Sequence, residues 1–277
     1  MVFPSTAFAF FASIYVDGMA TTSFLTRVPH ILLWTWVNLL AFTVNNQRTQ
    51  SSITEDRLNK PWRPIPSGRL APCQANVIGN LTYPIAQLIS VLLGGGHAQS
   101  ALLSILGCAY NELGGGGDCG PIARNIINAA GFTSFASGAF EVATSGGAVR
   151  TAPTMNAWLG IIASVVSTTV HAQDMYDTIG DAATGRRTVP LVFGDKQARM
   201  SSAGAVMFWS AVCPYYWGSG ISGSAVPTIL GTWVAWRTLS RTSPPEDRAT
   251  FRIYNVWLVG IYSLPAMAQL SSVAQGG

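Results

Sequence analysis

The chain has 277 residues, of which 49% are hydrophobic and only 10% are charged. Soluble domains usually carry about 25% charged residues, so this chain has too few charges to cover the surface of a soluble protein. The net charge of +4 does not indicate nucleic-acid binding, because the Lys and Arg residues lie in short strips between apolar runs and not on one soluble face.

The N-terminal segment enters an apolar run directly, without the basic start of a secretory signal, and is predicted to form a first membrane helix. Further apolar stretches follow, separated by polar or glycine-rich breaks, and a membrane helix needs about 20 mostly apolar residues. We therefore predict one all-α, polytopic membrane domain over residues 1–277 with about nine transmembrane helices. The predicted spans are residues 3–20, 31–46, 72–93, 98–113, 124–144, 154–173, 201–218, 222–239 and 253–272.

The charged residues are distributed unevenly over the breaks between these spans. Fourteen of the 16 basic residues lie on even-numbered breaks, which share one side of the membrane, and only Arg27 and Arg150 lie opposite. Short cytoplasmic loops are enriched in Lys and Arg, so the N-terminus is predicted to be cytoplasmic and the C-terminus to lie across the membrane. Ten of the 12 acidic residues share the basic side. Acidic residues contribute little to the orientation of a membrane protein, so their concentration on one side indicates a function located there.

One acidic cluster follows the sixth predicted span. Asp174, Asp177 and Asp181 stand at positions i, i+3 and i+7, so on a continuous helix their carboxylates project from one face. Like charges so close to an apolar run repel one another, and a divalent cation such as Mg²⁺ would relieve that repulsion. The alternative is a solvated helix end whose acids pair with Arg186 and Arg187.

A second polar cluster joins spans two and three. Glu55 and Asp56, with Asn46 as a neutral oxygen ligand, are predicted to supply the opposite side of the same metal site. We therefore expect the two clusters, distant along the chain, to meet across one cavity.

Basic residues are interleaved with these acids. Arg binds phosphate through a two-pronged fork and Lys binds it as a point charge, so Lys60, Arg63, and Arg186 or Arg187 are candidates for binding a diphosphate. The alternative is that these residues only determine membrane topology.

Two segments resemble motifs of a known family. Residues 59–69, NKPWRPIPSGR, and residues 174–191, with Asp-x-x-Asp-x-x-x-Asp followed by Gly-Arg-x-Thr-x-Pro-Leu, are similar to the segments around the two Asp-rich motifs of the UbiA superfamily of intramembrane prenyltransferases. The resemblance implies an all-helical fold of nine spans around a central cavity that uses Mg²⁺ and an isoprenoid diphosphate. It also implies an integral membrane protein of the endoplasmic reticulum, with the active site facing the cytoplasm.

The first motif departs from the family pattern Asn-x-x-x-Asp-x-x-x-Asp. Asp56 matches the last aspartate, but Ser52 and Arg48 stand where the middle aspartate and the Asn are expected. This degenerate form resembles the fungal, bergamotene-type UbiA sesquiterpene cyclases, which cyclise farnesyl diphosphate without an acceptor. The resemblance therefore implies a Mg²⁺-dependent membrane-bound terpene cyclase whose partners are the isoprenoid diphosphate and the lipid bilayer.

The implied reaction assigns roles to the acidic residues. Mg²⁺ held by Glu55, Asp56 and the three aspartates after span six would neutralise the diphosphate so that it can leave. Aromatic faces in a dry pocket would stabilise the remaining allylic cation, and Tyr176, next to the acids in sequence, is the first candidate.

Two other functions stay open at this point. A UbiA-type prenyltransferase would use the same diphosphate site and pass the prenyl group to an aromatic or lipid acceptor. A transporter or an inactive membrane scaffold belongs to another class, but transporters place ionisable groups near the middle of the membrane, whereas here only Glu141 lies within a span.

Overall fold

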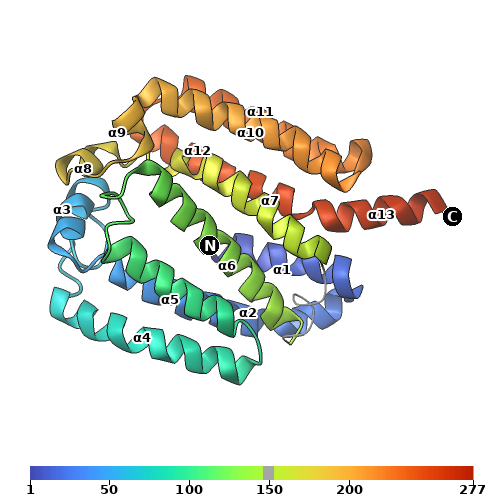
Figure 1. Ribbon diagram of the computed structural model, residues 1–277, viewed down its shortest axis with the longest axis horizontal. Coiled ribbons are helices and arrows are strands. Elements are labelled where there is room, and N and C mark those ends of the chain that lie inside the picture. Colours follow the sequence, from blue (N-terminus) through green and yellow to red (C-terminus); the bar gives the residue numbers. More distant parts are fainter. Residues whose placement is uncertain (146–152, 277) are drawn as a thin grey trace.

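The computed structural model describes residues 1–145 and 153–276, whose regular secondary structure is entirely helical. Long helices run side by side, and short helices gather at one end of them (Figure 1). The long helices are α1 (Val2–Asp17), α2 (Thr21–Asn45), α4 (Pro72–Leu93), α5 (His97–Asn111), α6 (Pro121–Ala143), α7 (Pro153–Thr169), α10 (Asp195–Trp217), α11 (Gly220–Ser240), α12 (Pro244–Tyr262) and α13 (Leu264–Gly276). The short ones are α3 (Gln50–Asn59), the 3₁₀ helix η1 (Val170–Gln173), α8 (Thr178–Ala183) and α9 (Val189–Phe193).

Each predicted apolar stretch coincides with a long helix of the described chain, and α12 and α13 share the ninth stretch. The all-α prediction is confirmed, although the second helix begins at Thr21, ten residues earlier than predicted. Three helices of the described chain are long and apolar enough to cross a membrane by length and composition: α2, α4 and α7 continued through η1. Helices α1 and α5, with 16 and 15 residues, are shorter than a usual span of about 17 to 25. The number of nine spans therefore stays a prediction.

Buried tryptophans tie pairs of helices together. The indole of Trp34 on α2 donates a hydrogen bond to Ser90 Oγ on α4, and that of Trp257 on α12 donates to Ser210 Oγ on α10, each at 2.9 Å. A buried indole N–H needs a partner, and hydroxyl groups at helix interfaces supply one where water is excluded. The small serine side chains thus fix which helices pack closely.

The outer surface of the bundle is apolar. Helix α4 exposes a row of large hydrophobic side chains, namely Val77, Leu81, Ile85, Leu88 and Val91. A soluble monomer rarely exposes an apolar face of this length. The exposed row suits contact with lipid chains and agrees with the membrane character predicted from composition.

The polar connections meet at one end of the bundle, around α3, α8 and α9 (Figure 1). Arg48 after α2 forms an ion pair with Glu112 after α5. Arg248 on α12 donates to the backbone carbonyl of Asn59 at 3.1 Å, and the Asn59 side chain donates to the carbonyl of Asp177 at 2.8 Å. These bonds join the four even-numbered breaks, as the charge distribution predicted.

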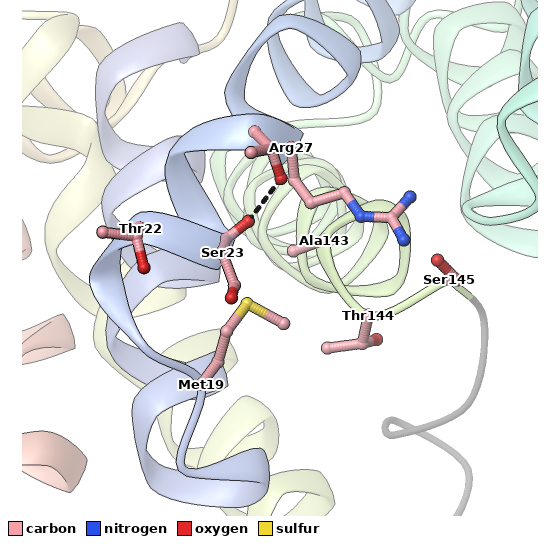
Figure 2. Close-up of a pocket in the computed structure, with 8 residues that line it drawn as sticks. Met19, Thr22, Ser23, Arg27, Ala143, Thr144 and Ser145 are labelled. Atoms are coloured by element: carbon pink, nitrogen blue, oxygen red, sulfur yellow. Dashed lines mark hydrogen bonds between the residues drawn. The ribbon is translucent and has the colours of Figure 1, made fainter.

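The opposite end carries an open cavity of about 490 Å³ between the α1–α2 turn and the end of α6 (Figure 2). Its described lining is rich in hydroxyl groups, including Thr22, Ser23 and Thr144, and Arg27 is the charged side chain in it. One guanidinium without a carboxylate offers no metal ligand set. Arg150, predicted on this side, lies outside the described residues.

Candidate functional site

The two polar clusters lie side by side because α3 packs against α8. Asn59, the last residue of α3, bonds both ends of a turn in the second cluster: its side chain donates to the Asp177 carbonyl at 2.8 Å and accepts from the Gly180 N–H at 2.9 Å. Helix α3 is capped by Thr49, which precedes it and whose hydroxyl accepts from the Ser52 N–H at 3.2 Å. The expected meeting of the clusters is therefore a feature of the structure.

The second cluster is not one continuous helix, so that prediction is wrong. Helix α7 ends at Thr169 and passes through η1 into a turn; Asp174 follows η1, Asp177 precedes α8 and Asp181 lies within α8. The three carboxylates are consequently separated onto different basic partners and do not project from a single helical face. Separation onto different partners relieves the repulsion that a shared face would impose.

Arg124 on α6 holds Asp174 from a distant part of the chain. Its guanidinium reaches one Asp174 oxygen through Nη2 at 2.7 Å and through Nε at 3.2 Å, with the two side chains 5% and 1% exposed. It also donates to the Tyr110 hydroxyl and the Gly116 carbonyl. Arg124 was not among the site residues predicted from the sequence. Its signal was an Arg at the edge of an otherwise apolar span.

The remaining acids are also buried beside bases. The pairs are Lys60 with Asp177 at 2.5 Å, Arg63 with Asp56 at 2.8 Å, and Arg186 with Glu55 at 2.8 Å and Asp181 at 3.6 Å. The bases that were predicted to bind phosphate therefore hold the acids in this structure, and a bound polyanion would share these cations with them.

A glycine run after α5 brings the backbone against these guanidiniums. A β-carbon at Gly117 would lie 2.7 Å from Cγ of Arg186, which is closer than β-carbons approach other atoms. The Gly117 carbonyl also accepts from the Arg187 N–H at 3.2 Å. In the sequence this run is only a glycine-rich break between apolar stretches, whereas in the structure it allows close packing.

Several buried carboxylate oxygens keep unused bonding capacity. Asp177 Oδ1 and both Asp181 oxygens accept no hydrogen bond within the described chain. Burial raises the pKa of Asp181 to about 7, although Arg124 acts in the opposite direction, and burial also raises the pKa of Asp177 and of Glu55. Free carboxylate oxygens in such surroundings suit a hard divalent cation.

The carboxylates of the site can supply part of the coordination of a Mg²⁺ ion, but not all of it. Among the described residues no three His, Cys, Asp or Glu side chains converge closely enough to hold a metal ion by themselves. Mg²⁺ is commonly held by one or two carboxylates and completed by water and phosphate oxygens. Asp177 and Asp181, with Glu55 nearby, can supply such a partial set.

A polar cavity of about 180 Å³ opens among these residues. Seven predicted site residues line it: Asn46, Glu55, Lys60, Arg63, Tyr176, Asp177 and Arg186. Sequence reasoning did not assign five further lining residues: Phe42, Tyr110, Arg124, Asn128 and Gln173. Four cations and two carboxylates are among these residues, so the lining favours an anion.

Four predicted residues are not among the residues that line the cavity. Asp56, Asp174 and Asp181 are buried, and each pairs with an arginine that does line the cavity. Arg187 is exposed at the surface, so of the two candidate arginines only Arg186 faces the cavity.

Tyr176 lines the cavity with its ring flanked by cations. Lys60 Nζ lies 5.8 Å and the Arg248 guanidinium 5.3 Å from the ring centroid. Burial raises the pKa of Tyr176, so its hydroxyl stays protonated. The Tyr176 ring thus already makes cation–π interactions with two positively charged side chains.

An apolar cavity of about 120 Å³ adjoins the polar one. Its walls include Leu39, Leu103, Leu106, Ile127, Phe132 and Phe135. Both cavities share Phe42, Tyr110 and Asn128, which we call the neck. The Phe42 and Tyr110 rings meet edge to face, 5.6 Å between centroids. The site thus combines a cation-rich compartment with a hydrocarbon-lined one.

The two departures from the first motif have structural explanations. Arg48 points away from the cavity, donating to Asn76 Oδ1 at 3.0 Å and pairing with Glu112, so it links α2 to α4 and α5. Ser52 takes part in the N-terminal cap of α3 through Thr49. Neither side chain occupies a ligand position.

The apolar helical bundle and its two-part cavity define a membrane-type helical protein whose site has a cation-rich end and a hydrocarbon-lined end. Comparison with protein families identifies it further. The chain belongs to the UbiA prenyltransferase family, whose model matches residues 2–259.

Relatives of known activity include both cyclases and transferases. The chain is 29% identical over 242 residues to a fumagillin beta-trans-bergamotene synthase of Aspergillus fumigatus, covering 86% of this chain and 80% of the relative. It is 30% identical over 260 residues to a polyprenyl transferase of Hericium erinaceus, covering 89% and 83%. The predicted likeness to fungal UbiA-type cyclases is confirmed.

Solved structures share the fold. A UbiA homolog from Aeropyrum pernix superimposes with a TM-score of 0.66 at 14% identity, covering 100% of this chain and 98% of the other. A UbiA homolog from Archaeoglobus fulgidus bound to GPP and Mg²⁺ gives 0.58 at 11% identity, covering 96% of each chain. The UbiA architecture is therefore retained at low sequence identity.

Proposed function

We propose that the protein is a Mg²⁺-dependent terpene cyclase that ionises farnesyl diphosphate and closes the resulting cation into a ring. Loss of a proton to the released diphosphate then gives a neutral cyclic sesquiterpene. The observation that carries the proposal is the neck, where a compartment with four cations meets one lined by aliphatic and aromatic side chains. An isoprenoid diphosphate has the matching polarity, with a charged end and an apolar tail. The bergamotene synthase relative supports a sesquiterpene product.

The polar compartment performs the ionising step. Lys60, Arg63, Arg124 and Arg186 bind the diphosphate oxygens, and their charge stabilises the negative charge that grows as the C1–O bond breaks. Asp177 and Glu55, which line the compartment, would hold Mg²⁺, which supplies Lewis-acid neutralisation of the diphosphate. Buried Asp181 has oxygens without hydrogen-bond partners that could complete the ligand set. The predicted ligands Asp56 and Asp174 act indirectly, by orienting Arg63 and Arg124.

The apolar compartment protects the carbocation. The rings of Phe42, Tyr110, Phe132 and Phe135 face this compartment and stabilise positive charge through their quadrupoles. The shortage of polar groups keeps water from quenching the cation to an alcohol. Tyr176 stays a candidate, although its ring already contacts two cations, so we assign the larger role to the neck rings.

Prenyl transfer to an acceptor is the second candidate, supported by the polyprenyl transferase relative. The degenerate first motif, which resembles that of the fungal cyclases, favours cyclisation over transfer.

Glu141 does not support a transport function. Its carboxylate accepts from the Gly96 N–H at 2.9 Å and from the Gln99 amide at 3.1 Å, and so it stabilises the start of α5. The acid within a predicted span is thereby explained by helix packing.

The site is further proposed to face the cytoplasm from the endoplasmic reticulum membrane. The concentration of basic residues at the end that carries the polar cavity supports this orientation. Protease protection of a tag at each terminus in sealed microsomes tests it, and a protected N-terminus with an accessible C-terminus would contradict it.

Incubation of detergent-solubilised protein with farnesyl diphosphate and Mg²⁺ tests the reaction, with and without a phenolic acceptor. We expect a cyclic hydrocarbon in the organic extract of both reactions. A prenylated phenol formed only with the acceptor would establish the transferase, and the absence of any diphosphate release would refute both activities.

A further inference from the structure

We propose that Asn128 is a further catalytic residue, which donates a hydrogen bond from Nδ2 to the oxygen that joins C1 of the prenyl chain to the diphosphate. The inference rests on the proposed function, because it assigns a role within the ionising step. It concerns the place where the polar and apolar cavities meet.

The position of Asn128 along α6 supports this role. Arg124 lines the polar cavity, Asn128 the neck, and Phe132 and Phe135 the apolar cavity. Residues four apart lie on one face of a helix, each about 6 Å further along its axis at 1.5 Å per residue. A substrate lying along α6 with its phosphates at Arg124 therefore places its ester oxygen about one turn further, beside Asn128.

The amide of Asn128 lacks an internal partner. Its Nδ2 atom is buried, and no acceptor among the described residues bonds to it. An amide nitrogen buried without a partner destabilises a protein, and a ligand oxygen in the neck would satisfy it. A side-chain amide N–H₂ can only donate, so its partner must be an acceptor, as the ester oxygen is.

The other polar side chains near the neck already have partners. The Tyr110 hydroxyl accepts a hydrogen bond from Arg124 and keeps its own proton to donate, and Thr43 Oγ1 donates to the Leu40 carbonyl at 3.2 Å. Phe42 contributes only its ring. Among the neck residues, Asn128 thus has a buried polar atom, Nδ2, without any hydrogen-bond partner in the described chain.

The chemistry of the step gives this donor a defined task. The C1–O bond breaks heterolytically, and its electron pair goes to the oxygen, which leaves as part of the diphosphate. The carbon chain keeps the allylic positive charge, so no oxidant or reductant is required. Negative charge on the oxygen grows toward the transition state, and a fixed donor at that atom lowers the barrier more than it tightens substrate binding.

Steady-state kinetics of Asn128→Leu and Asn128→Ala test the proposal. Removal of one oxyanion donor typically lowers kcat by about 10²–10³-fold, and we expect this loss with KM changed less than about threefold. Asn255→Leu is the matched control: its Nδ2 donates to the Phe251 carbonyl on its own helix at 2.7 Å, and it lines neither cavity. We expect its kcat to stay within about twofold of wild type.

A second substrate separates a catalytic role from a structural one. In farnesyl thiolodiphosphate, sulfur replaces the ester oxygen and accepts hydrogen bonds only weakly. The wild-type to Asn128→Leu rate ratio should fall from about 10² or more with oxygen to below about 10 with sulfur. A merely structural role leaves the ratio equal on both substrates.

The outcomes distinguish the inference from the function on which it rests. If wild-type protein releases no diphosphate, the proposed function fails and the role of Asn128 fails with it. If wild type is active but both Asn128 variants match its kcat, or if both show one rate ratio on the two substrates, only the assignment of Asn128 is overturned.

Discussion

The buried pair of Arg124 and Asp174 offers a quantitative test of the site. Replacement of Arg124 by Met keeps much of the side-chain length but leaves Asp174 buried without its cation. Both side chains are at most 5% exposed, so water cannot easily reach the Asp174 carboxylate once its partner is removed. Breaking a buried pair in this way destabilises a protein by about 3–5 kcal/mol.

This loss is large enough to measure as a change in thermal stability. For chains of about 150–250 residues, 1 kcal/mol corresponds to roughly 2–4 °C in Tm, so Arg124→Met should unfold about 6–20 °C below wild type. The double variant Arg124→Met/Asp174→Leu should recover most of this difference, because it removes the orphaned charge as well. Tryptophan fluorescence, followed during heating in the same detergent, measures the Tm of wild type, the single variant and the double variant.

Activity and stability should separate in the double variant. It is expected to fold as wild type does yet release no diphosphate, because the polar cavity has lost a cation. A single variant that melts with wild type, or a double variant as unstable as the single one, would refute the assignment of Arg124 as the partner that keeps Asp174 buried.

Further predictions concern the cavity and its support. Arg186→Ala should raise KM for the diphosphate about tenfold or more, because hydrogen bonds to charged groups contribute about 1.5–3 kcal/mol. Arg187 is exposed, so the KM of Arg187→Ala should stay within about twofold of wild type in the same assay. Asp177→Asn and Asp181→Asn should each raise the Mg²⁺ concentration needed for half-maximal turnover, and an unchanged Mg²⁺ titration would exclude them as ligands. Glu141→Ala should lower stability by about 1–2 kcal/mol in thermal melts with KM unaltered, and a changed KM would contradict its purely structural role.

The predictable part of the fold came from long-range regularities of the sequence. Apolar runs of membrane length indicated the long helices, and the gathering of acids and bases on alternate breaks indicated a single polar end. Paired motifs then predicted Lys60, Arg63, Asp177 and Arg186, which the structure brings to one cavity.

The unpredicted part depends on which face of an apolar helix points inward. Phe42 and Asn128 lie within apolar runs, where spacing cannot separate a cavity wall from a packed interface, because both faces of a membrane helix are apolar. The partner of Asp174 lies 50 residues away, beyond the reach of local pattern. The helical spacing of the aspartates was also misleading, since the break after α7 is set by tertiary packing.

The glycine run after α5 has a consequence for sequence variation. At Gly117 the main chain lies so close to Arg186 that a methyl group would displace the guanidinium, and the neighbouring carbonyl of Gly116 anchors Arg124. The backbone of Gly116 and Gly117 therefore fixes how deeply the side chains of Arg124 and Arg186 lie in the site. Homologues that preserve the charge arrangement should therefore tolerate little change at these two buried positions, even though neither carries a side chain.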